Sequence, residues 1–494
     1  MTREIRHRET LARATAATVL VAVSCAVVCV HAATLVSRPA GYMKVRLAPG
    51  SQRLVALPFE AFDNSIEAVL GNQLTAAADE EFGDRVLKWD QASQCYIGAV
   101  RLGPDRFGPW AGVTEAAWYT DEKGTARSGM TFEPGEGFWL QNRQSEEEEV
   151  MLAGEVVLRE TVAISFYPVL NLFSTPFLSP SALNEAGLVE AGAAGGDTIE
   201  QADVVAGWDA KDPFGGKYKR WWLLSKDGDA RDGKWVDVEE GEEAGDVLKP
   251  GTGYWYHRKF APGFVWEVDR PYEDLFPSDE EALPRIEGIG KDEKGNAVVQ
   301  IAVDGAAGLV LEIYIQDILD SKGFLARKAW RVGATALQTA GRDRITWTDT
   351  VPAEPGKPEP LGRCYLTAIS GIDTDGDGLG DAYEEFILQT NPLKADSDGD
   401  GLGDAEELAQ GTSPSDPKSK RVLYVDQAIG SDAYTGRFKS VSGVDGPKKT
   451  INAALEISEP GDVIRVSGGV YKENVFLWGK DVKLISDGKV RLAH

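Results

Sequence analysis

The sequence is poor in the side chains that build most zinc sites and nucleophilic triads. Its 494 residues include four histidines and four cysteines, and half of each lie in the first 32 residues. Only His257, His494, Cys95 and Cys364 lie beyond that segment. A histidine-based triad or a histidine-rich zinc site can hardly be built from this set. Two cysteines in different predicted domains exclude a disulfide framework, and we expect each to be a small hydrophobe.

Basic residues are also scarce relative to acidic ones. The chain has 52 lysines and arginines against 78 aspartates and glutamates, a formal net charge of −26. Such a chain repels nucleic acid unless it carries a basic patch, so we expect no nucleic-acid partner. At 43% hydrophobic and 26% charged residues the composition is that of ordinary globular protein. The length exceeds a single core, so several domains are expected.

Beyond the N-terminus, no stretch approaches the roughly 20 apolar residues needed to span a bilayer. Residues 1–32 read as an export signal. A basic start with four arginines precedes the mostly apolar run 14–30, and Val30 and Ala32 supply small residues at the cleavage positions. The alternatives are a single membrane anchor and, as a minor option, lipidation at Cys25 or Cys29, neither of which has the usual leucine. We expect no membrane span after signal removal and a secreted or cell-surface protein, with the periplasm as a further location.

Two acidic loops follow one another between residues 373 and 416. Each matches D-x-D-x-D-G-x5-E, with a further acid at position 9. Calcium takes about six to eight oxygen ligands, which alternating carboxylates, one backbone carbonyl and a closing glutamate can supply. The competing interpretation is a solvated acidic linker. The expected ligands are Asp373, Asp375, Asp377, the Leu379 carbonyl, Asp381 and Glu384 in the first loop, and Asp396, Asp398, Asp400, the Leu402 carbonyl, Asp404 and Glu407 in the second.

This segment, 371–420, resembles the bacterial form of the thrombospondin type 3 repeat. In such repeats the acidic loop is followed by a short helix and a Thr-x-Pro step, here at Thr390–Pro392 and Thr412–Pro414. The resemblance implies a rigid, calcium-dependent spacer of exported proteins, and hence a structural role. An EF-hand sensor is the alternative, but a sensor needs helices on both sides of each loop. A proline-rich loop and a strand-like run precede the first loop instead.

Residues 40–157 and 158–272 are predicted to be two copies of one β-rich domain of about 115–120 residues. Three motifs recur in register: Leu54–Phe59 as Leu172–Phe177, Asp84–Asp90 as Asp203–Asp209, and Phe132–Trp139 as Leu248–Trp255. Short apolar runs broken by Gly, Pro and Asp indicate antiparallel strands, with short helices near 65–70 and 180–191. We expect the recurring tryptophans Trp89, Trp139, Trp208 and Trp255 to pack in the cores.

Residues 280–370 are predicted to form a β-sandwich. Strand-like runs, a tryptophan, a proline-rich loop and a closing strand with tyrosine follow in that order, which resembles fibronectin type III-like modules of bacterial surface proteins. Trp347 and Tyr365 would then lie in the sandwich core. The resemblance implies spacing or adhesion and supplies no catalytic residue.

Residues 421–494 resemble the entrance to a right-handed parallel β-helix of the pectate-lyase-like superfamily. Residues 450–458 would be the capping helix, and Ile464, Val466, Val475, Leu484 and Ile485 the inward residues of the first coils. Only two or three coils of roughly 20–25 residues fit here. Because stacked coils need at least three neighbours, we expect a fragment of a longer protein, the alternative being a vestigial domain. The resemblance implies that any catalytic residues would lie on later coils, which this chain does not contain.

Together these patterns predict a mostly β, multidomain fold: two duplicated antiparallel β domains, a β-sandwich, a calcium-loop segment with short helices, and the first coils of a parallel β-helix. The favoured function is an exported, calcium-binding surface protein with a structural, adhesive or scaffolding role. One alternative is a carbohydrate-active enzyme whose catalytic part is mostly missing from this chain. Another is a carbohydrate-binding protein, with a polysaccharide or another cell-surface component as partner. No catalytic constellation is found in the sequence, which therefore favours a non-enzymatic function without deciding the question.

Overall fold

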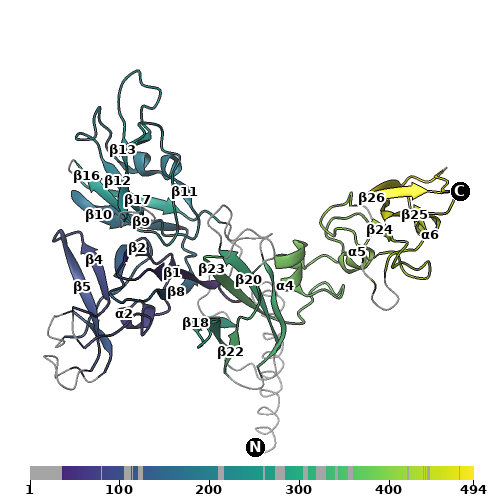
Figure 1. Cartoon of the computed structure of the whole chain (residues 1–494), viewed down its shortest axis with the longest axis horizontal. Helices are drawn as coiled ribbons and strands as arrows, with labels where there is room; N and C mark the ends of the chain where they lie inside the picture. The colour runs from purple at the N-terminus through teal and green to yellow at the C-terminus, as the bar shows by residue number, and fades with distance from the viewer. Residues whose placement is uncertain are drawn as a thin grey trace, which may run out of the picture. The chain divides into compact units, whose positions relative to one another are not determined.

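The computed structural model divides into two compact units, one covering Ala33–Ser370 and the other including Gly371–His494. Strands make up most of the regular structure, as the sequence predicts (Figure 1). The predicted export signal, 1–32, lies outside the described residues. Among the described residues no helix is long and apolar enough to cross a membrane. The structure describes residues 36–78, 81–104, 113, 115–120, 126–209, 216–259, 262–272, 284–303, 310–318, 330–339, 343–353, 360–419, 422–437, 439, 441, 446–477 and 479–493.

In the first unit, two sheets share one hydrophobic core. A six-stranded sheet has the order β21-β20-β23-β1-β8-β3 and a three-stranded sheet the order β18-β19-β22. Apolar residues of both sheets meet in this core, where Tyr365 is fully buried and Trp347 packs against it edge-on with ring centroids 5.8 Å apart. The strands are β1 (Ala40–Leu47), β3 (Phe59–Glu60), β8 (Glu148–Val156), β18 (Arg285–Lys291), β19 (Ala297–Ala302), β20 (Val310–Ile318), β21 (Arg331–Gln338), β22 (Arg344–Thr348) and β23 (Gly362–Ile369).

The large sheet crosses a domain boundary drawn from the sequence. β1 and β8 were assigned to the first repeat, yet β1 lies between β8 and β23 and pairs antiparallel with both. Nearly every residue of β1 is buried, so its backbone groups need partners along both edges. Its second partner comes from a strand more than three hundred residues away in sequence, which no local pattern could indicate.

Two five-stranded antiparallel sheets occupy the rest of the unit, in the orders β2-β7-β4-β5-β6 and β10-β16-β12-β13-β14. Strands that carry matching motifs hold the same places in the two sheets. The first contains β2 (Gln52–Ala56), β4 (Arg85–Asp90), β5 (Cys95–Leu102), β6 (Ala117–Tyr119) and β7 (Gly137–Gln141). The second contains β10 (Val169–Phe173), β12 (Val204–Asp209), β13 (Lys217–Leu223), β14 (Trp235–Asp237) and β16 (Tyr254–Arg258).

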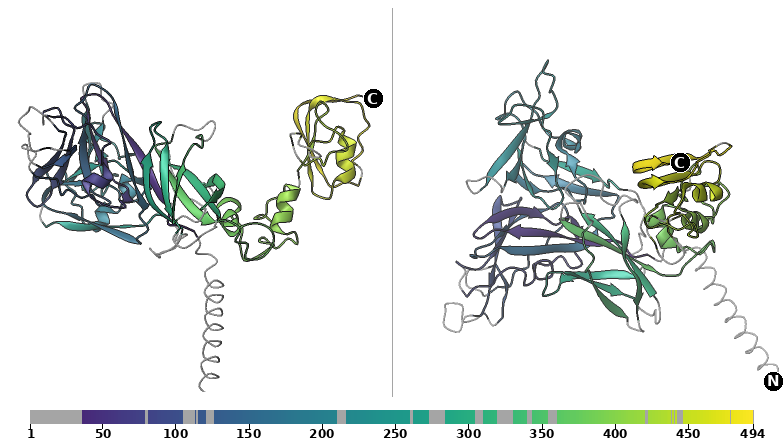
Figure 2. Two further views of the ribbon diagram at one scale, coloured as in Figure 1. Left: turned by 90° about the horizontal axis from the view of Figure 1, so that it is seen from below. Right: turned by 45° about the vertical axis from the view of Figure 1, so that its right-hand side comes forward.

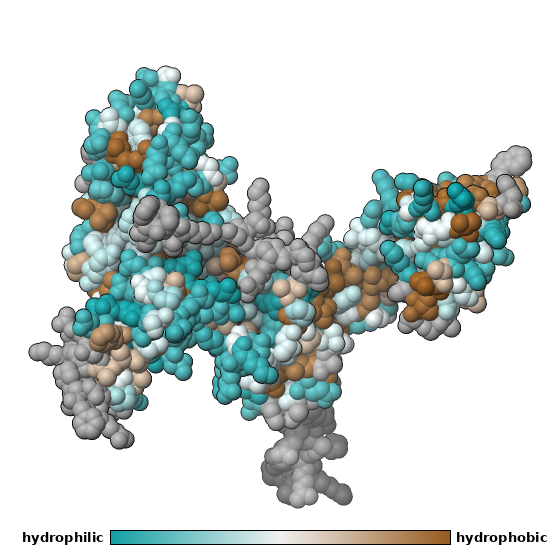
Figure 3. All heavy atoms as spheres, in the orientation of Figure 1, coloured by the Kyte–Doolittle hydropathy of each residue, from teal (hydrophilic) through white to brown (hydrophobic). Residues whose placement is uncertain are grey.

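Two separate two-stranded sheets and several short helices accompany these larger sheets. β9 (Thr161–Phe166) pairs with β17 (Phe264–Asp269), and β11 (Ser181–Ala182) with β15 (Val247–Leu248). Short helices lie near the predicted positions: α2 (Ile66–Val69), the 3₁₀ turn η2 (Leu183–Glu185) and α3 (Leu188–Ala191). Hydrophilic residues cover most of the face seen in Figure 3.

The recurring tryptophans lie where the two five-stranded sheets meet. Trp89 packs edge-on against Trp255 with ring centroids 5.2 Å apart, and Trp139 against Trp208 at 5.5 Å. Each pair joins one residue of the first sheet to one of the second. Three of the four are only half-buried, and Trp139 is fully buried. These rings therefore join the two sheets to each other rather than filling the core of each.

In the second unit, three parallel strands follow the two acidic loops (Figure 2). β24 (Val422–Val425) pairs with β25 (Val463–Tyr471), which pairs with β26 (Lys483–Leu492). α6 (Ile451–Ile457) lies against them, and the Thr450 hydroxyl caps it by accepting a hydrogen bond from the Ala453 N–H at 3.2 Å. Ile464, Val466, Val475 and Leu484 belong to the core with α6. Ile485 does not, because neighbouring strand residues face opposite sides.

Candidate metal centre

The two acidic loops have nearly the same backbone conformation. Gly376 and Gly378 have φ of 80° and 100°, and Gly399 and Gly401 have 80° and 99°. These left-handed values favour glycine, because a Cβ would be strained there. Each loop leads into a short helix: α4 (Asp381–Tyr383) with the π-helical turn η4 (Glu384–Leu388), and α5 (Asp404–Gln410).

In each loop the first three aspartates gather their carboxylates in one place. Carboxylate oxygens of Asp373, Asp375 and Asp377 lie within 4.8 Å of one another, and so do those of Asp396, Asp398 and Asp400. The first aspartate also folds the loop around itself: the Gly376 and Gly378 amides donate to Asp373 at 2.8 and 3.0 Å. Equivalent bonds hold Asp396 in the second loop. Like charges so close together repel unless a cation lies between them.

The glutamate at position 12 of each loop is buried near the loop's aspartates. Glu384 and Glu407 are 0% and 1% exposed, and the Oε2 atom of each has no hydrogen-bond partner among the described residues. Burial first, and then the negative charge of nearby aspartates, raises the pKa of each glutamate to about 7. A buried carboxylate oxygen without a partner is costly. Both glutamates therefore fit the closing ligand of a divalent cation.

Further carboxylate oxygens in the loops are also left without partners. Asp375 Oδ2 and Asp398 Oδ2 are buried and accept no hydrogen bond from a described residue. The pKa of each is raised, chiefly by burial and partly by the charge of neighbouring aspartates. A hard divalent cation would satisfy these oxygens, and the all-oxygen donor set suits calcium.

The two aspartates at position 9 do not behave alike. Both oxygens of Asp381 accept hydrogen bonds from Thr374, from its N–H at 2.8 Å and its hydroxyl at 2.6 Å. Asp404 accepts one bond, from the Ser397 N–H at 2.8 Å, and its Oδ2 is buried without a partner. The serine hydroxyl instead accepts a hydrogen bond from the Asn391 amide. Asp381 thus stabilises its loop through two hydrogen bonds, whereas Asp404 has an oxygen that no described residue contacts by a hydrogen bond.

The second loop contacts the first through the start of α5. The Ala405 N–H donates to Asp377 Oδ2 at 3.3 Å. The charge of Asp404 contributes to the raised pKa of both Glu384 and Glu407, so Asp404 lies near the closing glutamates of both loops. The two candidate sites are therefore neighbours in one structure.

Sequence reasoning missed the hydroxyl residues that support the carboxylates. Thr374 and Ser397, at position 2 of each loop, hold the two position-9 aspartates, and the Thr390 hydroxyl donates to Glu384 Oε1 at 3.1 Å. A hydroxyl residue at position 2 of both loops was the available signal. The amides of Leu379 and Leu402 donate to Asp377 and Asp400, while their carbonyls remain predicted ligands.

Comparison with known protein families finds two repeats in this segment. Residues 373–395 and 396–417 each match the family model described as the bacterial TSP3 repeat. Such repeats bind calcium and are typical of extracellular proteins. No curated protein matches the chain.

Proposed function

We propose that this chain is an exported modular protein whose two acidic loops each bind one calcium ion and so stiffen the segment 371–420. The observation that carries the proposal is the set of buried carboxylate oxygens without partners, on Asp375, Glu384, Asp398, Asp404 and Glu407. All five belong to the ligands that the loop motif predicts. In a solvated acidic linker these oxygens would face water, because burying a carboxylate oxygen without a partner is costly.

In each loop, one cation bound by several carboxylates would hold the loop closed. The aspartates at positions 1, 3 and 5 approach from one side, and the buried glutamate approaches from the short helix that follows. Bound calcium would neutralise these charges and tie the helix to the loop. Without it, repulsion among the carboxylates opens the loop. The function of the segment is therefore mechanical: it keeps the modules on either side apart at a fixed distance when calcium is present.

The surrounding modules suit a scaffolding or adhesive role. The matching strand orders of the two five-stranded sheets support a duplicated domain, 40–157 and 158–272, and β1, β3 and β8 of the first copy join the sheet that contains β20, β21 and β23. The parallel pairing of β24, β25 and β26 supports the first coils of a β-helix in 421–494. The basic and apolar N-terminus, the acidic composition and the repeat family support export to the surface or the medium.

Limited proteolysis of the full chain tests the function. With calcium present we expect residues 371–420 to resist cleavage, and with chelator we expect cuts in that range. The variant Asp375→Asn/Asp398→Asn should be cut under both conditions. A matched control, Asp227→Asn/Asp229→Asn, changes two aspartates of a turn outside the loops and should behave as the parent. Equal cleavage of the parent chain with and without calcium would sink the proposal.

A further inference from the structure

The duplicated region contains two equivalent strand pairs whose neighbouring strands differ. β1 pairs with β8 from Ala40↔Glu155 to Leu47↔Glu148, and β9 pairs with β17 from Thr161↔Asp269 to Phe166↔Phe264. Their sequence spacing is that of the repeated motifs, so β9 corresponds to β1 and β17 to β8. The two pairs differ in what lies along the edge of β1 that faces away from β8 and along the edge of β9 that faces away from β17.

In the first copy the chain fills that edge with its own strand. β23 pairs antiparallel with β1 from Ala40↔Tyr365 to Met43↔Gly362. The Lys44 N–H continues the ladder by donating to the Leu361 carbonyl at 2.8 Å. The structure thus contains an example of a peptide segment that fits this kind of edge.

In the second copy no described strand pairs along the corresponding edge of β9. The Arg270 N–H donates to the Glu160 carbonyl at 2.8 Å. Because the backbone groups of successive residues point to opposite edges, those of Thr161, Ala163 and Ser165 point away from β17. No described residue forms a backbone hydrogen bond with these outward groups.

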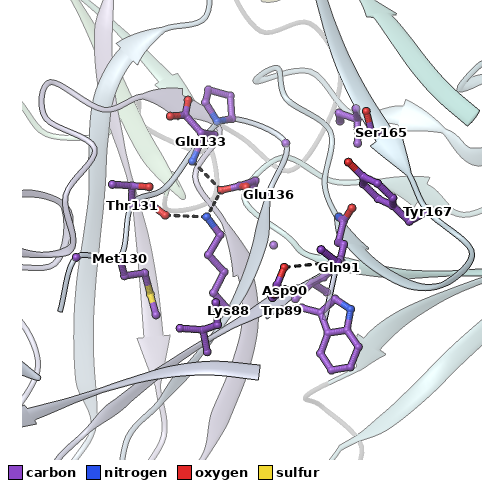
Figure 4. A pocket seen from close by; sticks show the side chains of 18 of the residues that line it. Lys88, Trp89, Asp90, Gln91, Met130, Thr131, Glu133, Glu136, Ser165 and Tyr167 are labelled. Atoms are coloured by element: carbon purple, nitrogen blue, oxygen red, sulfur yellow. Dashed lines mark hydrogen bonds and ion pairs between the residues drawn. The ribbon is translucent and has the colours of Figure 1, made fainter. Parts of the chain in front are cut away.

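A hollow of about 690 Å³ lies beside this edge. Lys88 and Glu136, paired at 2.6 Å, face it from the first copy, and Ser165 and Tyr167 face it from the second (Figure 4). The equivalent hollow of the first copy is bordered by Leu361, which leads into β23, and by Ile318 at the end of β20. That hollow measures about 670 Å³ although β23 is in place, so a strand added to β9 would border the hollow beside it without filling it.

We propose that the edge of β9 facing away from β17 binds an extended segment of a partner polypeptide by antiparallel strand addition, with a basic residue of that segment opposite Glu160. This mode takes its affinity from backbone hydrogen bonds and its specificity from the side chains at alternate positions. It rests on the equivalence of the two copies and not on calcium binding.

The side chains along the two edges define the chemistry of the segment. Gly362 approaches β1 so closely that a Cβ there would collide with the Tyr42 carbonyl oxygen, so the segment needs glycine at that place. Gly41 faces Cys364 in the filled edge, and its counterpart in the second copy is the exposed Glu160. A lysine or arginine in place of Cys364 would meet that carboxylate. The favoured pattern is therefore Leu-Gly-x-Lys.

A second copy of this chain is a poor donor of the segment. Its own β23 lies inside a sheet, between β20 and β1, and is fully paired. Releasing it would dismantle the core that contains Tyr365. The occupant is thus a separate polypeptide with a free extended segment.

The test uses a labelled peptide of residues 360–369 of this chain with Cys364→Lys, titrated with the full chain and followed by fluorescence anisotropy. We expect the lysine peptide to bind about two- to fivefold more tightly than the unmodified one, as an exposed ion pair allows. The same peptide with Gly362→Val should not bind. The chain variant Glu160→Lys should reverse the preference, favouring a Cys364→Glu peptide over the lysine peptide.

Ala163→Pro provides a second chain variant. Proline is tolerated on an edge strand whose N–H is unused, but it cannot donate to an added strand, so we expect binding to weaken about tenfold or more. Ser165→Ala changes only a side chain and should bind as the parent does. The proposal is overturned if no peptide binds at millimolar chain, or if neither Glu160→Lys nor Ala163→Pro changes binding. It is also overturned if the chain forms dimers that Ala163→Pro dissociates, because the edge then serves self-association.

Discussion

Replacing Asp404 by asparagine removes one negative charge from the buried end of the second loop. Asp404 is fully buried, its Oδ1 is held by the Ser397 N–H, and its Oδ2 has no partner among the described residues. We expect Asp404→Asn to keep the Ser397 bond through its amide oxygen. The second oxygen becomes an amide nitrogen, which cannot bind a cation.

The expected size follows from that lost ligand. A hydrogen bond to a charged group contributes about 1.5–3 kcal/mol, and we take the loss of one charged ligand oxygen to be of the same order. About 1.4 kcal/mol is a tenfold change in affinity. We therefore expect the Kd for calcium to rise about 10–100-fold. Because Asp404 lies near both Glu384 and Glu407, both binding steps should weaken. Isothermal titration of the calcium-depleted full chain, at a pH above the raised pKa of about 7 of the two glutamates, measures each step.

Asp381→Asn is the matched control, since it changes the same position of the first loop. Both oxygens of Asp381 are held by Thr374, and an asparagine can keep both bonds, accepting from the N–H and donating to the hydroxyl. We expect less than about a fivefold change in Kd. Equal losses in the two variants, or no loss in Asp404→Asn, would refute the reasoning from free and occupied oxygens.

Three further predictions concern the unit Ala33–Ser370. Burial, a neighbouring aspartate and its hydrogen bond raise the pKa of Glu148 to about 7. The folded state therefore holds the proton more tightly than the unfolded state, so the stability of the fold falls as the pH rises from about 4.5 through 7. Glu148→Gln should raise Tm at pH 8 but not at pH 4. Asp203 is fully buried and pairs with Arg258 at 2.5 Å. Asp203→Ala leaves the Arg258 guanidinium buried without its partner and should lower the free energy of unfolding by about 3–5 kcal/mol, as measured in denaturant melts. A loss of less than about 1 kcal/mol would contradict the burial argument. A Cβ at Gly41 would collide with Cys364 Sγ, so Gly41→Val should cost about 1–3 kcal/mol; an unchanged Tm would mean that β1 and β23 are not paired as described.

The two groups of three aspartates in the candidate metal centre could be predicted from the sequence, because the members of each group are close together in the chain. The carboxylates of Asp373, Asp375 and Asp377 meet within five residues of chain, and glycines fix the left-handed turns that bring them together. The sequence could not show which position-9 aspartate keeps a free oxygen. That difference depends on whether a threonine or a serine hydroxyl turns toward the carboxylate, which the fold around each loop decides.

The mostly β character and the recurring motifs were likewise determined by the sequence alone, since alternation and turn residues act over a few positions. Tertiary structure alone decided how the strands associate. β1 takes β23 as its neighbour, and Trp89 meets Trp255 across two sheets, because backbone groups and aromatic surfaces must find partners somewhere in the folded chain. Strand pairing carries no sequence code over such separations, so only the folded chain shows that β9 pairs with β17 and with no other described strand.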